Sequence, residues 1–429
     1  MMRRWQQWIL VGVLATSACP GTARANEVDV LLNKLVEKGI LTASEAQEVR
    51  NEMGPELVKS DKALDQKIED GAKKGLPDSV KTWKWKGDLR LRNEYRSQSA
   101  GVGTDRNRQR IRFRYGFEAI ANDHMTVGAR LATGSTTDPI STNQNFNTSF
   151  NHMALVLDQA YVNYMPEIFG ISAVKLSGGQ IGNPYWHREQ LVWDDDLNFQ
   201  GANLHLEETL GPVNMFANGG VFSLNTDIIR SSALWTLQGG SSIQPFKGRG
   251  MEEVFEKLKL TGAIAYDDYM NVTSKAGDTT ALTTAGGLKG ASAALKDWNL
   301  INPNVAIDSE LAGMPVGFYG DWVHNTAAFD DGNGYLLGVK VGNAKKPFDL
   351  KEGWEAGYDF EHLEDNATFG ALTNSDFGNG GTNHRGSAYW LKLAVLKNSS
   401  VGLTVLNTRE LGGSKNRVDT YQMDWITSF

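Results

Sequence analysis

The stretch Trp83-Lys84-Trp85-Lys86-Gly87-Asp88-Leu89-Arg90-Leu91-Arg92-Asn93-Glu94-Tyr95-Arg96, residues 83–96, decides the fold class of this chain. Its apolar side chains fall on one face and its charged side chains on the other. Side chains of a strand point to opposite faces with a period of two, so this alternation predicts a strand with one apolar and one polar face. A soluble β-sandwich would bury the apolar face between two sheets. A membrane β-barrel would turn it to lipid and keep the charges in a wet interior.

The same alternation recurs as far as Phe429, the last residue. We place about sixteen strands, near residues 83–96, 107–120, 125–134, 152–165, 172–182, 197–208, 213–224, 233–243, 257–269, 303–311, 316–327, 334–343, 351–364, 386–397, 401–411 and 417–429. Long and short connections roughly alternate, as in outer-membrane barrels, and an even strand number puts both barrel ends on the periplasmic side. The pattern is weakest over 225–256 and 270–302, so fourteen strands would also fit. We therefore predict an all-β fold, a transmembrane antiparallel β-barrel of about 16 strands over residues 81–429.

The composition excludes several classes of protein. The net charge of -7 argues against a nucleic-acid partner. Beyond the N-terminus, the chain has no apolar run of the roughly 18 to 20 residues that a membrane-spanning helix needs. A membrane location would therefore require strands.

The N-terminus is typical of a secretory signal peptide, residues 1–25. Arg3 and Arg4 precede an apolar stretch over residues 8–15, and a small-residue cleavage site follows at residues 23–25. The alternatives are an amphipathic surface helix and lipidation at Cys19. Cys19 is the one cysteine in the chain, so cleavage after Ala25 would leave no disulfide and no thiolate metal or redox chemistry.

Residues 26–80 are predicted to be helical and periplasmic. Leucine and valine recur at helical spacing over 31–36, and Thr42 with Glu45 forms a capping-box pattern for a second helix. The charged stretch 56–76 places Leu57, Leu64, Ile68 and Ala72 at approximately heptad or i,i+4 spacing. This stretch is either a solvated helix or a short coiled coil that joins subunits.

Several motifs in the first part of the chain resemble the putative porin family of Gram-negative bacteria. They are Val28-Asp29-Val30-Leu31-Leu32, Leu41-Thr42-Ala43-Ser44-Glu45-Ala46, Lys86-Gly87-Asp88-Leu89-Arg90-Leu91-Arg92, Arg110-Ile111-Arg112-Phe113-Arg114-Tyr115-Gly116 and Asp158-Gln159-Ala160-Tyr161-Val162. The resemblance implies an outer-membrane barrel, a homotrimer and a short periplasmic leader. It carries over no catalytic or ligand-binding residue.

Basic residues concentrate on the predicted inner face of three neighbouring strands. If the apolar residues of 107–120 face lipid, the inner face carries an arginine wall: Arg90, Arg92, Arg96, Arg108, Arg110, Arg112, Arg114 and Arg130. Charged walls bias which ions enter a pore. Alternatively, these arginines form ordinary salt bridges with acids such as Asp88, Glu94 and Glu118.

An acidic, aromatic loop after the fifth predicted strand, residues 183–196, is the candidate constriction. We expect Glu189, Asp194, Asp195 and Asp196 to line one side of it, opposite the arginines. External acids that bind calcium or bridge lipopolysaccharide are the rival interpretation. Glu355, Asp359 and Glu361 share one face of 351–364 and predict an acidic wall. A lumen that is basic on one side and acidic on the other creates a transverse field, without strong preference for either ion sign.

The sequence predicts no enzyme, cofactor or metal. Its seven histidines form no metal-type pair, and neither a Gly-x-Ser-x-Gly elbow nor a phosphate-binding glycine loop occurs. We expect an outer-membrane porin that passes small hydrophilic solutes and ions by passive diffusion, in contact with lipid and lipopolysaccharide. The strand that ends at Phe429 resembles the signal read by the barrel-assembly machinery. The alternatives are a solute-selective channel, for example one that binds anions, or a structural barrel tethered through its N-terminal helices.

Overall fold

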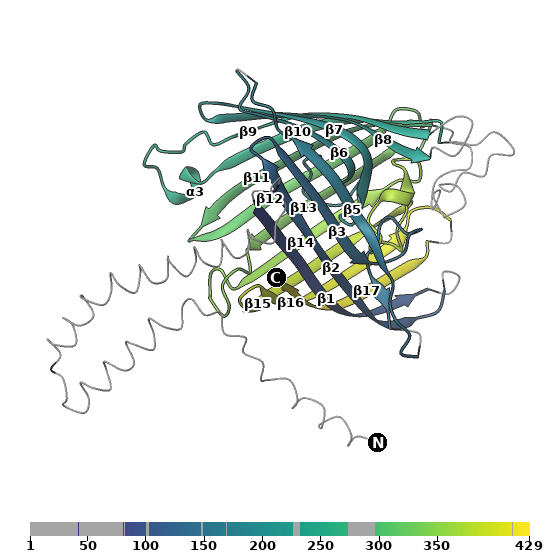
Figure 1. Cartoon of the computed structure of the whole chain (residues 1–429). Coiled ribbons are helices and arrows are strands. Elements are labelled where there is room, and N and C mark those ends of the chain that lie inside the picture. Colours follow the sequence, from purple (N-terminus) through teal and green to yellow (C-terminus); the bar gives the residue numbers. More distant parts are fainter. Residues whose placement is uncertain are drawn as a thin grey trace. The chain divides into compact units, whose positions relative to one another are not determined.

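The fold is described from a computed structural model of the chain (Figure 1). It describes residues 82–99, 103–146, 149–168, 170–225, 232–272, 297–413 and 415–429, together with Thr42 and Val80. The barrel belongs to a compact unit that runs from Val80 to Phe429. The predicted signal peptide (1–25) and nearly all of the predicted helical segment (26–80) lie outside the described residues. None of the described helices is long and apolar enough to cross a membrane.

The described residues are organised almost entirely as strands. The strands are β1 (Thr82–Gln98), β2 (Arg106–Asn122), β3 (Met125–Thr133), β4 (Gln144–Asn145), β5 (Leu155–Tyr164), β6 (Ala173–Gly182), β7 (Asn198–Leu210), β8 (Val213–Asn225), β9 (Ser232–Ile243), β10 (Lys259–Met270), β11 (Trp298–Leu311), β12 (Met314–Asn325), β13 (Asn333–Gly342), β14 (Trp354–Leu363), β15 (His384–Leu396), β16 (Ser399–Glu410) and β17 (Arg417–Ser428). One helical turn, α3 (Glu253–Glu256), lies between β9 and β10, and a 3-10 turn, η1 (Gly370–Leu372), lies between β14 and β15.

The sheet closes on itself. Each wall strand pairs antiparallel with its neighbours in the chain, and β1 pairs with both β2 and β17, so that Leu91 lies opposite Ile111 on one side and Trp425 on the other. The two-residue strand β4 pairs with β2, while β3 pairs directly with β5. Leaving β4 aside, the wall of described strands has sixteen members. The predicted strand number and antiparallel barrel are confirmed.

The sequence prediction misplaced the start of one strand. It began a strand at Pro303, whereas β11 begins at Trp298. Pro303 lies inside this strand opposite Ile264 of β10. Proline cannot donate a backbone hydrogen bond and is rare within strands. The five residues before it were therefore assigned to the connection.

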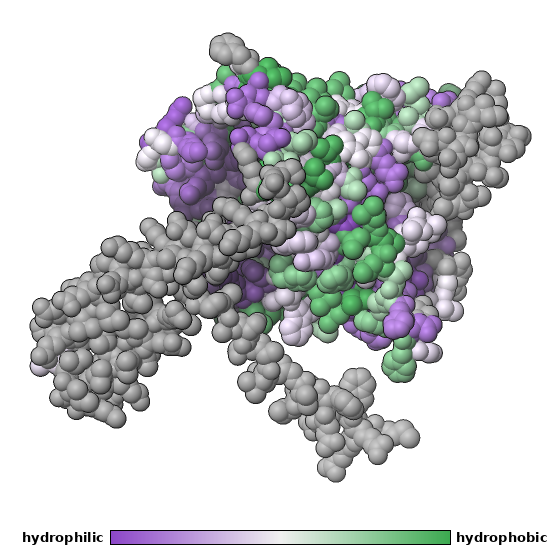
Figure 2. All heavy atoms as spheres, viewed as in Figure 1, coloured by the Kyte–Doolittle hydropathy of each residue, from purple (hydrophilic) through white to green (hydrophobic). Residues whose placement is uncertain are grey.

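The exposure of side chains alternates as the pattern of residues 83–96 predicts. On β1, Leu91 is 44% exposed, whereas Arg92 and Glu94 on the other face are 7% and 0% exposed. Large apolar residues such as Leu237 lie exposed on the outer surface of other strands, and Figure 2 shows hydrophobic side chains gathered on the middle of the visible face. The apolar face is therefore the outer one, as a lipid-facing barrel wall requires.

The two ends of the barrel differ in their connections. At the end that holds the first residue of β1 and the last residue of β17, several turns are tight. In one of them Ala312 and Gly313 both have positive φ, +54° and +75°, which is the geometry of a two-residue hairpin turn. At the opposite end lie the long connections 134–154, 183–197 and 364–383. These long loops build the candidate site.

Candidate functional site

One side of the barrel interior is filled by an apolar cluster. The 183–197 loop supplies Leu191, Val192 and Trp193, which are 0%, 2% and 4% exposed. They belong to one cluster with inward-facing residues of β6 to β14 and with the 364–383 loop. The ring of Tyr269 stacks on Trp193 at 6.2 Å and on Phe369 at 5.2 Å. The 183–197 loop therefore folds into the barrel, where it packs against the wall. The interior differs from the uniformly polar one that the strand pattern predicts.

The arginine wall is present on the opposite side, but acids neutralise most of it. The register pairs Arg90 with Arg112 and Arg92 with Arg110 across β1 and β2. Like charges directly opposite each other are unfavourable unless counter-charges lie nearby. Arg92 donates two hydrogen bonds to Asp424 of β17, at 2.7 and 2.9 Å, and a third to Asp376 at 2.6 Å.

The other arginines of the wall are also bound to carboxylates. Arg108 Nε donates to Glu94 at 2.7 Å, and Glu94 lies 3.4 Å from Arg110. Asp88 accepts hydrogen bonds from Arg112 at 2.8 Å and from Arg114 at 2.7 Å.

Arg130 also binds a carboxylate, whereas Arg90 binds none among the described residues, and the predicted acid Glu118 lies elsewhere. Arg130 donates to Asp158 of β5. Arg90 has no carboxylate partner among the described residues, and its Nη2 donates to Asn143 Oδ1 at 2.6 Å. Glu118 accepts a hydrogen bond from the Tyr161 hydroxyl at 3.3 Å instead of pairing with an arginine.

Asp196 is the loop acid that the fold brings to the arginines. Its Oδ1 lies 3.3 Å from Arg114 Nη1 and 3.9 Å from Arg112 Nη1. Its Oδ2 accepts hydrogen bonds from the backbone and the hydroxyl of Thr142, at 3.1 and 3.0 Å. Asp196 therefore joins the 183–197 loop both to β2 and to the 134–154 connection.

The other three predicted loop acids have different surroundings. Asp194 is buried, and its Oδ2 accepts a hydrogen bond from the backbone N–H of Ser375 at 2.9 Å, which joins the 183–197 loop to the 364–383 loop. Asp195 is exposed. Glu189 lies within reach of Tyr319 and Asp359 on the acidic side of the barrel, so the fold places it away from the arginines.

Burial and neighbouring charges shift the pKa of three loop carboxyl groups. Burial raises the pKa of Asp194 to about 7, although two backbone N–H groups oppose the shift. Burial, reinforced by the charge of Asp359, raises the pKa of Glu189 to about 8. Burial also acts to raise the pKa of Asp376, but the guanidinium of Arg92 outweighs it and holds this pKa well below its usual range.

The predicted acidic wall lies on the inner face of β14. Glu355 is 3.9 Å from Lys340 Nζ, Asp359 accepts a hydrogen bond from the Tyr319 hydroxyl at 2.6 Å, and Glu361 is 2.8 Å from His384 Nε2. Sequence reasoning missed two further buried acids, Asp267 of β10 and Asp321 of β12, that face the same interior. Their alternation with outward apolar residues was the signal that could have identified them.

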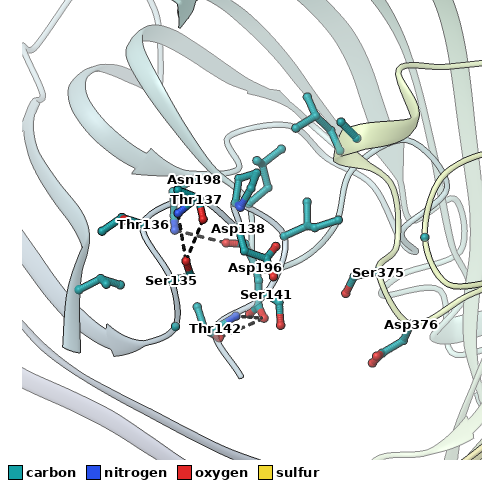
Figure 3. Close-up of a pocket in the computed structure, with 18 of the residues that line it drawn as sticks. Ser135, Thr136, Thr137, Asp138, Ser141, Thr142, Asp196, Asn198, Ser375 and Asp376 are labelled. Atoms are coloured by element: carbon teal, nitrogen blue, oxygen red, sulfur yellow. Dashed lines mark hydrogen bonds between the residues drawn. The ribbon is translucent and has the colours of Figure 1, made fainter. Parts of the chain in front are cut away.

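A cavity of about 1610 Å³ opens beside the arginine strands at the long-loop end (Figure 3). Its charged lining residues are four arginines, Arg96, Arg106, Arg108 and Arg110, and four aspartates, Asp138, Asp158, Asp196 and Asp376. The formal charge of this lining is thus four minus four, or zero. In Figure 3, Asp376 and Asp196 lie on opposite sides of the space.

The predicted site residues divide between this cavity and its surroundings. Arg96, Arg108, Arg110 and Asp196 line the cavity. The other predicted arginines lie elsewhere on β1, β2 and β3, and the other predicted acids lie in the 183–197 loop or on the acidic wall. The sequence analysis did not anticipate the 364–383 loop, which supplies Asp376 and also Asn379, whose side-chain oxygen accepts a hydrogen bond from Arg96. The unusual length of that connection was the signal available.

The chain is similar to one protein family and to several solved structures. The sequence profile of the putative porin family matches residues 97–296 and 303–429. Among solved structures, OprB of Pseudomonas putida in its high-pH form is 13% identical, with a TM-score of 0.54 and 84% of this chain and 97% of that chain covered. The outer-membrane channel DcaP of Acinetobacter baumannii is 13% identical, with 82% and 99% covered and a TM-score of 0.47. OmpF of Salmonella typhi in complex with daunomycin is 9% identical, with the same coverage and a TM-score of 0.48. No curated protein sequence matches the chain significantly.

Proposed function

Because the chain belongs to the putative porin family and is an outer-membrane channel for small solutes, we propose that solutes cross it by passive diffusion beside the arginine strands. The cavity of about 1610 Å³ supports this route, since it is larger than an ordinary ligand pocket of about 300 to 1000 Å³. The packed cluster around Leu191 and Trp193 fills the opposite side of the lumen. Small hydrophilic molecules would therefore pass along the charged side.

The constriction, in this proposal, is formed by two loops together. The 183–197 loop is held to β2 through Asp196, and the 364–383 loop is held to β1 through Asp376 and Arg92. Asp194 joins the two loops to each other through Ser375. These contacts support a narrow passage whose width is fixed by hydrogen bonds and ion pairs.

The same arrangement supports weak selectivity between cations and anions. The charged lining of the cavity sums to zero, and most of the arginines are already bound to carboxylates. Arg90, which has no carboxylate partner among the described residues, and Glu361 on the acidic wall support a field across the lumen. Such a field orients dipolar solutes without strongly favouring one sign of charge.

Thiol labelling in planar bilayers tests where the passage lies. Asp195 is exposed on the 183–197 loop, and Cys19 is the one cysteine of the chain, so Asp195→Cys in a Cys19→Ser background gives a single reactive thiol. A charged thiol reagent should lower the conductance of this variant. Met251→Cys, on an exposed connection outside the barrel wall, is the matched control. Equal responses of the two variants would refute the proposed constriction.

Liposome swelling tests the channel itself. Vesicles that contain the protein should swell in small neutral sugars at rates that fall with sugar size, and vesicles without protein should not. Absence of flux for every small solute would favour the structural alternative, a closed barrel tethered through residues 26–80.

A solute-selective channel for anions is the second candidate function. Two observations favour it: Arg90 has no carboxylate partner among the described residues, and the Nε of Arg96 is buried without a hydrogen-bond acceptor. In the anion-selective case, a dicarboxylate added at low concentration would reduce chloride conductance, and Arg90→Gln would remove that inhibition. If the dicarboxylate still reduces the chloride conductance of Arg90→Gln, the anion binds at another position.

We also propose the assembly features that the sequence predicts: a cleaved signal peptide, a periplasmic leader, a homotrimer and recognition of the last strand by the barrel-assembly machinery. The placement of Phe429 supports the last of these, because its ring lies 6.3 Å from Phe113 and 6.2 Å from Tyr115 on the outer face of β2. Deletion of Phe429 should lower the amount of folded protein in the outer membrane. Native mass spectrometry of the detergent-extracted protein would give the subunit number.

A further inference from the structure

Three arginines lie side by side on the outer surface of β15, β16 and β17. The strand register places Arg385 directly opposite Arg409, and Arg409 directly opposite Arg417. Side chains of directly opposite residues lie about 5 Å apart at their Cβ atoms. Their sequence offsets are even relative to an exposed residue on the same strand, Tyr389 for Arg385, Leu403 for Arg409 and Tyr421 for Arg417, so they share the outer face.

This row carries more positive charge than nearby carboxylates neutralise. Arg417 Nε lies 2.7 Å from Asp419 Oδ2, and Asp419 also accepts a hydrogen bond from Asn407 at 2.9 Å. Neither Arg385 nor Arg409 has a carboxylate within ion-pair distance among the described residues, and the Nε of Arg385 is buried without an acceptor. Directly opposite like charges destabilise a sheet unless an anion lies between them. The row is therefore incomplete without a negatively charged ligand.

The position of the row relative to the aromatic residues indicates which anion it meets. Tyr389 packs against Tyr358 with ring centroids 5.0 Å apart, and Tyr421 packs against Tyr95 at 6.2 Å. Tyrosines on the outer face of a barrel mark the membrane interface. Arg385 and Arg417 lie four residues beyond these tyrosines, about 13 Å along the strand, toward the long loops. In barrels of this kind the long loops are external, so the row lies at the level of the outer-leaflet headgroups.

We propose that Arg385, Arg409 and Arg417 form a binding site for the phosphate groups of lipopolysaccharide in the outer leaflet. This inference rests on the proposed outward orientation of the long loops. Guanidinium groups bind phosphate through paired, charge-assisted hydrogen bonds, which are about twice as strong as neutral ones. The phosphates supply the counter-charge that the protein lacks at Arg385 and Arg409, while the lipid chains cover the apolar outer face below them.

The test compares lipid binding by the full-length protein and its variants in detergent. Purified lipopolysaccharide is the probe, and the same lipid treated with phosphatase is the reference. Arg385→Gln with Arg409→Gln removes the two unpaired guanidiniums, and binding should weaken about tenfold or more. Arg249→Gln with Lys397→Gln removes the same charge from exposed positions at the other end of the barrel and should leave binding unchanged. Gel mobility with and without heating verifies that each variant is folded.

The proposal is overturned if the folded double variant binds as tightly as the parent, or if the parent binds dephosphorylated lipid equally well. It is also overturned if inorganic phosphate at low concentration occupies the site without lipid as tightly as the lipid does, since the site would then take a free anion. Liposome swelling with the same preparations separates this proposal from the channel proposal. A parent that binds the lipid but passes no solute would refute only the channel.

Discussion

Asp376→Asn removes one negative charge from the cavity and nearly preserves the size of the side chain. Asp376 accepts a hydrogen bond from Arg92 at 2.6 Å, lies 4.0 Å from Arg110, and lines the cavity. Its pKa is held below the usual range by Arg92, so the parent carries the full charge at neutral pH. The substitution changes the formal charge of the lining from zero to plus one.

The expected effect on ion preference follows from Coulomb's law. An ion that passes about 7 Å from the altered charge in a water-like dielectric gains or loses about 0.6 kcal/mol, which is close to RT. Anions are enriched and cations depleted by the same factor of about 2.7, so the anion-to-cation ratio rises about sevenfold. Screening reduces this value: the Debye length is about 30 Å at 0.01 M salt and about 3 Å at 1 M. The shift should be close to its full size in dilute salt and nearly absent in concentrated salt.

Reversal potentials in planar bilayers, measured across a salt gradient, give the ratio directly. The barrel should remain folded, because Arg92 keeps both hydrogen bonds to Asp424. Asp268→Asn is the matched control, since Asp268 lies on the outward-facing side of β10. An unchanged reversal potential in dilute salt would refute the assignment of Asp376 to the passage. A shift of equal size at every salt concentration would indicate a rearranged loop instead of a lost charge.

Three further predictions test other parts of the structure. Asp194 and Glu189, with pKa values of about 7 and about 8, are neutral in mild acid and charged in mild base, so cation preference should rise between about pH 6 and about pH 9. Reversal potentials measured at several pH values report this change in cation preference, and the double variant Asp194→Asn with Glu189→Gln should not show it. A parent whose cation preference does not change with pH would contradict the raised pKa values. Leu191→Ala should lower the free energy of unfolding by about 2 to 5 kcal/mol, because Leu191 is 0% exposed in the interior cluster. Denaturant titration in detergent measures it, and a loss below about 1 kcal/mol would mean that the loop is not packed there. Leu237→Arg, at a 64% exposed outer position, should cost about 2 to 4 kcal/mol of stability in a bilayer, and a neutral effect would argue against contact of this face with lipid.

The sequence by itself determined the strands and their two faces, because a period of two is a local property. Leu91 and Arg92 are neighbours, and their opposite chemistry is enough to assign one to lipid and the other to the interior. Sixteen such segments could therefore be placed before any contact was known. The strand start near Pro303 was missed because a local rule, the absence of a proline N–H, did not end the strand. Pro303 pairs with Ile264 of β10, and the pairing with β12 resumes at Asn304.

Only the tertiary structure decided which charges meet and where the interior is dry. Arg92 pairs with Asp424, which is 332 positions away, because barrel closure brings β17 beside β1. The 183–197 loop carries both Leu191 and Asp196, and its sequence does not show that the first would pack against β6 to β14 while the second reaches Arg114. Such contacts depend on how a closed wall orients side chains from distant segments toward one shared interior. No local period in the sequence records that geometry.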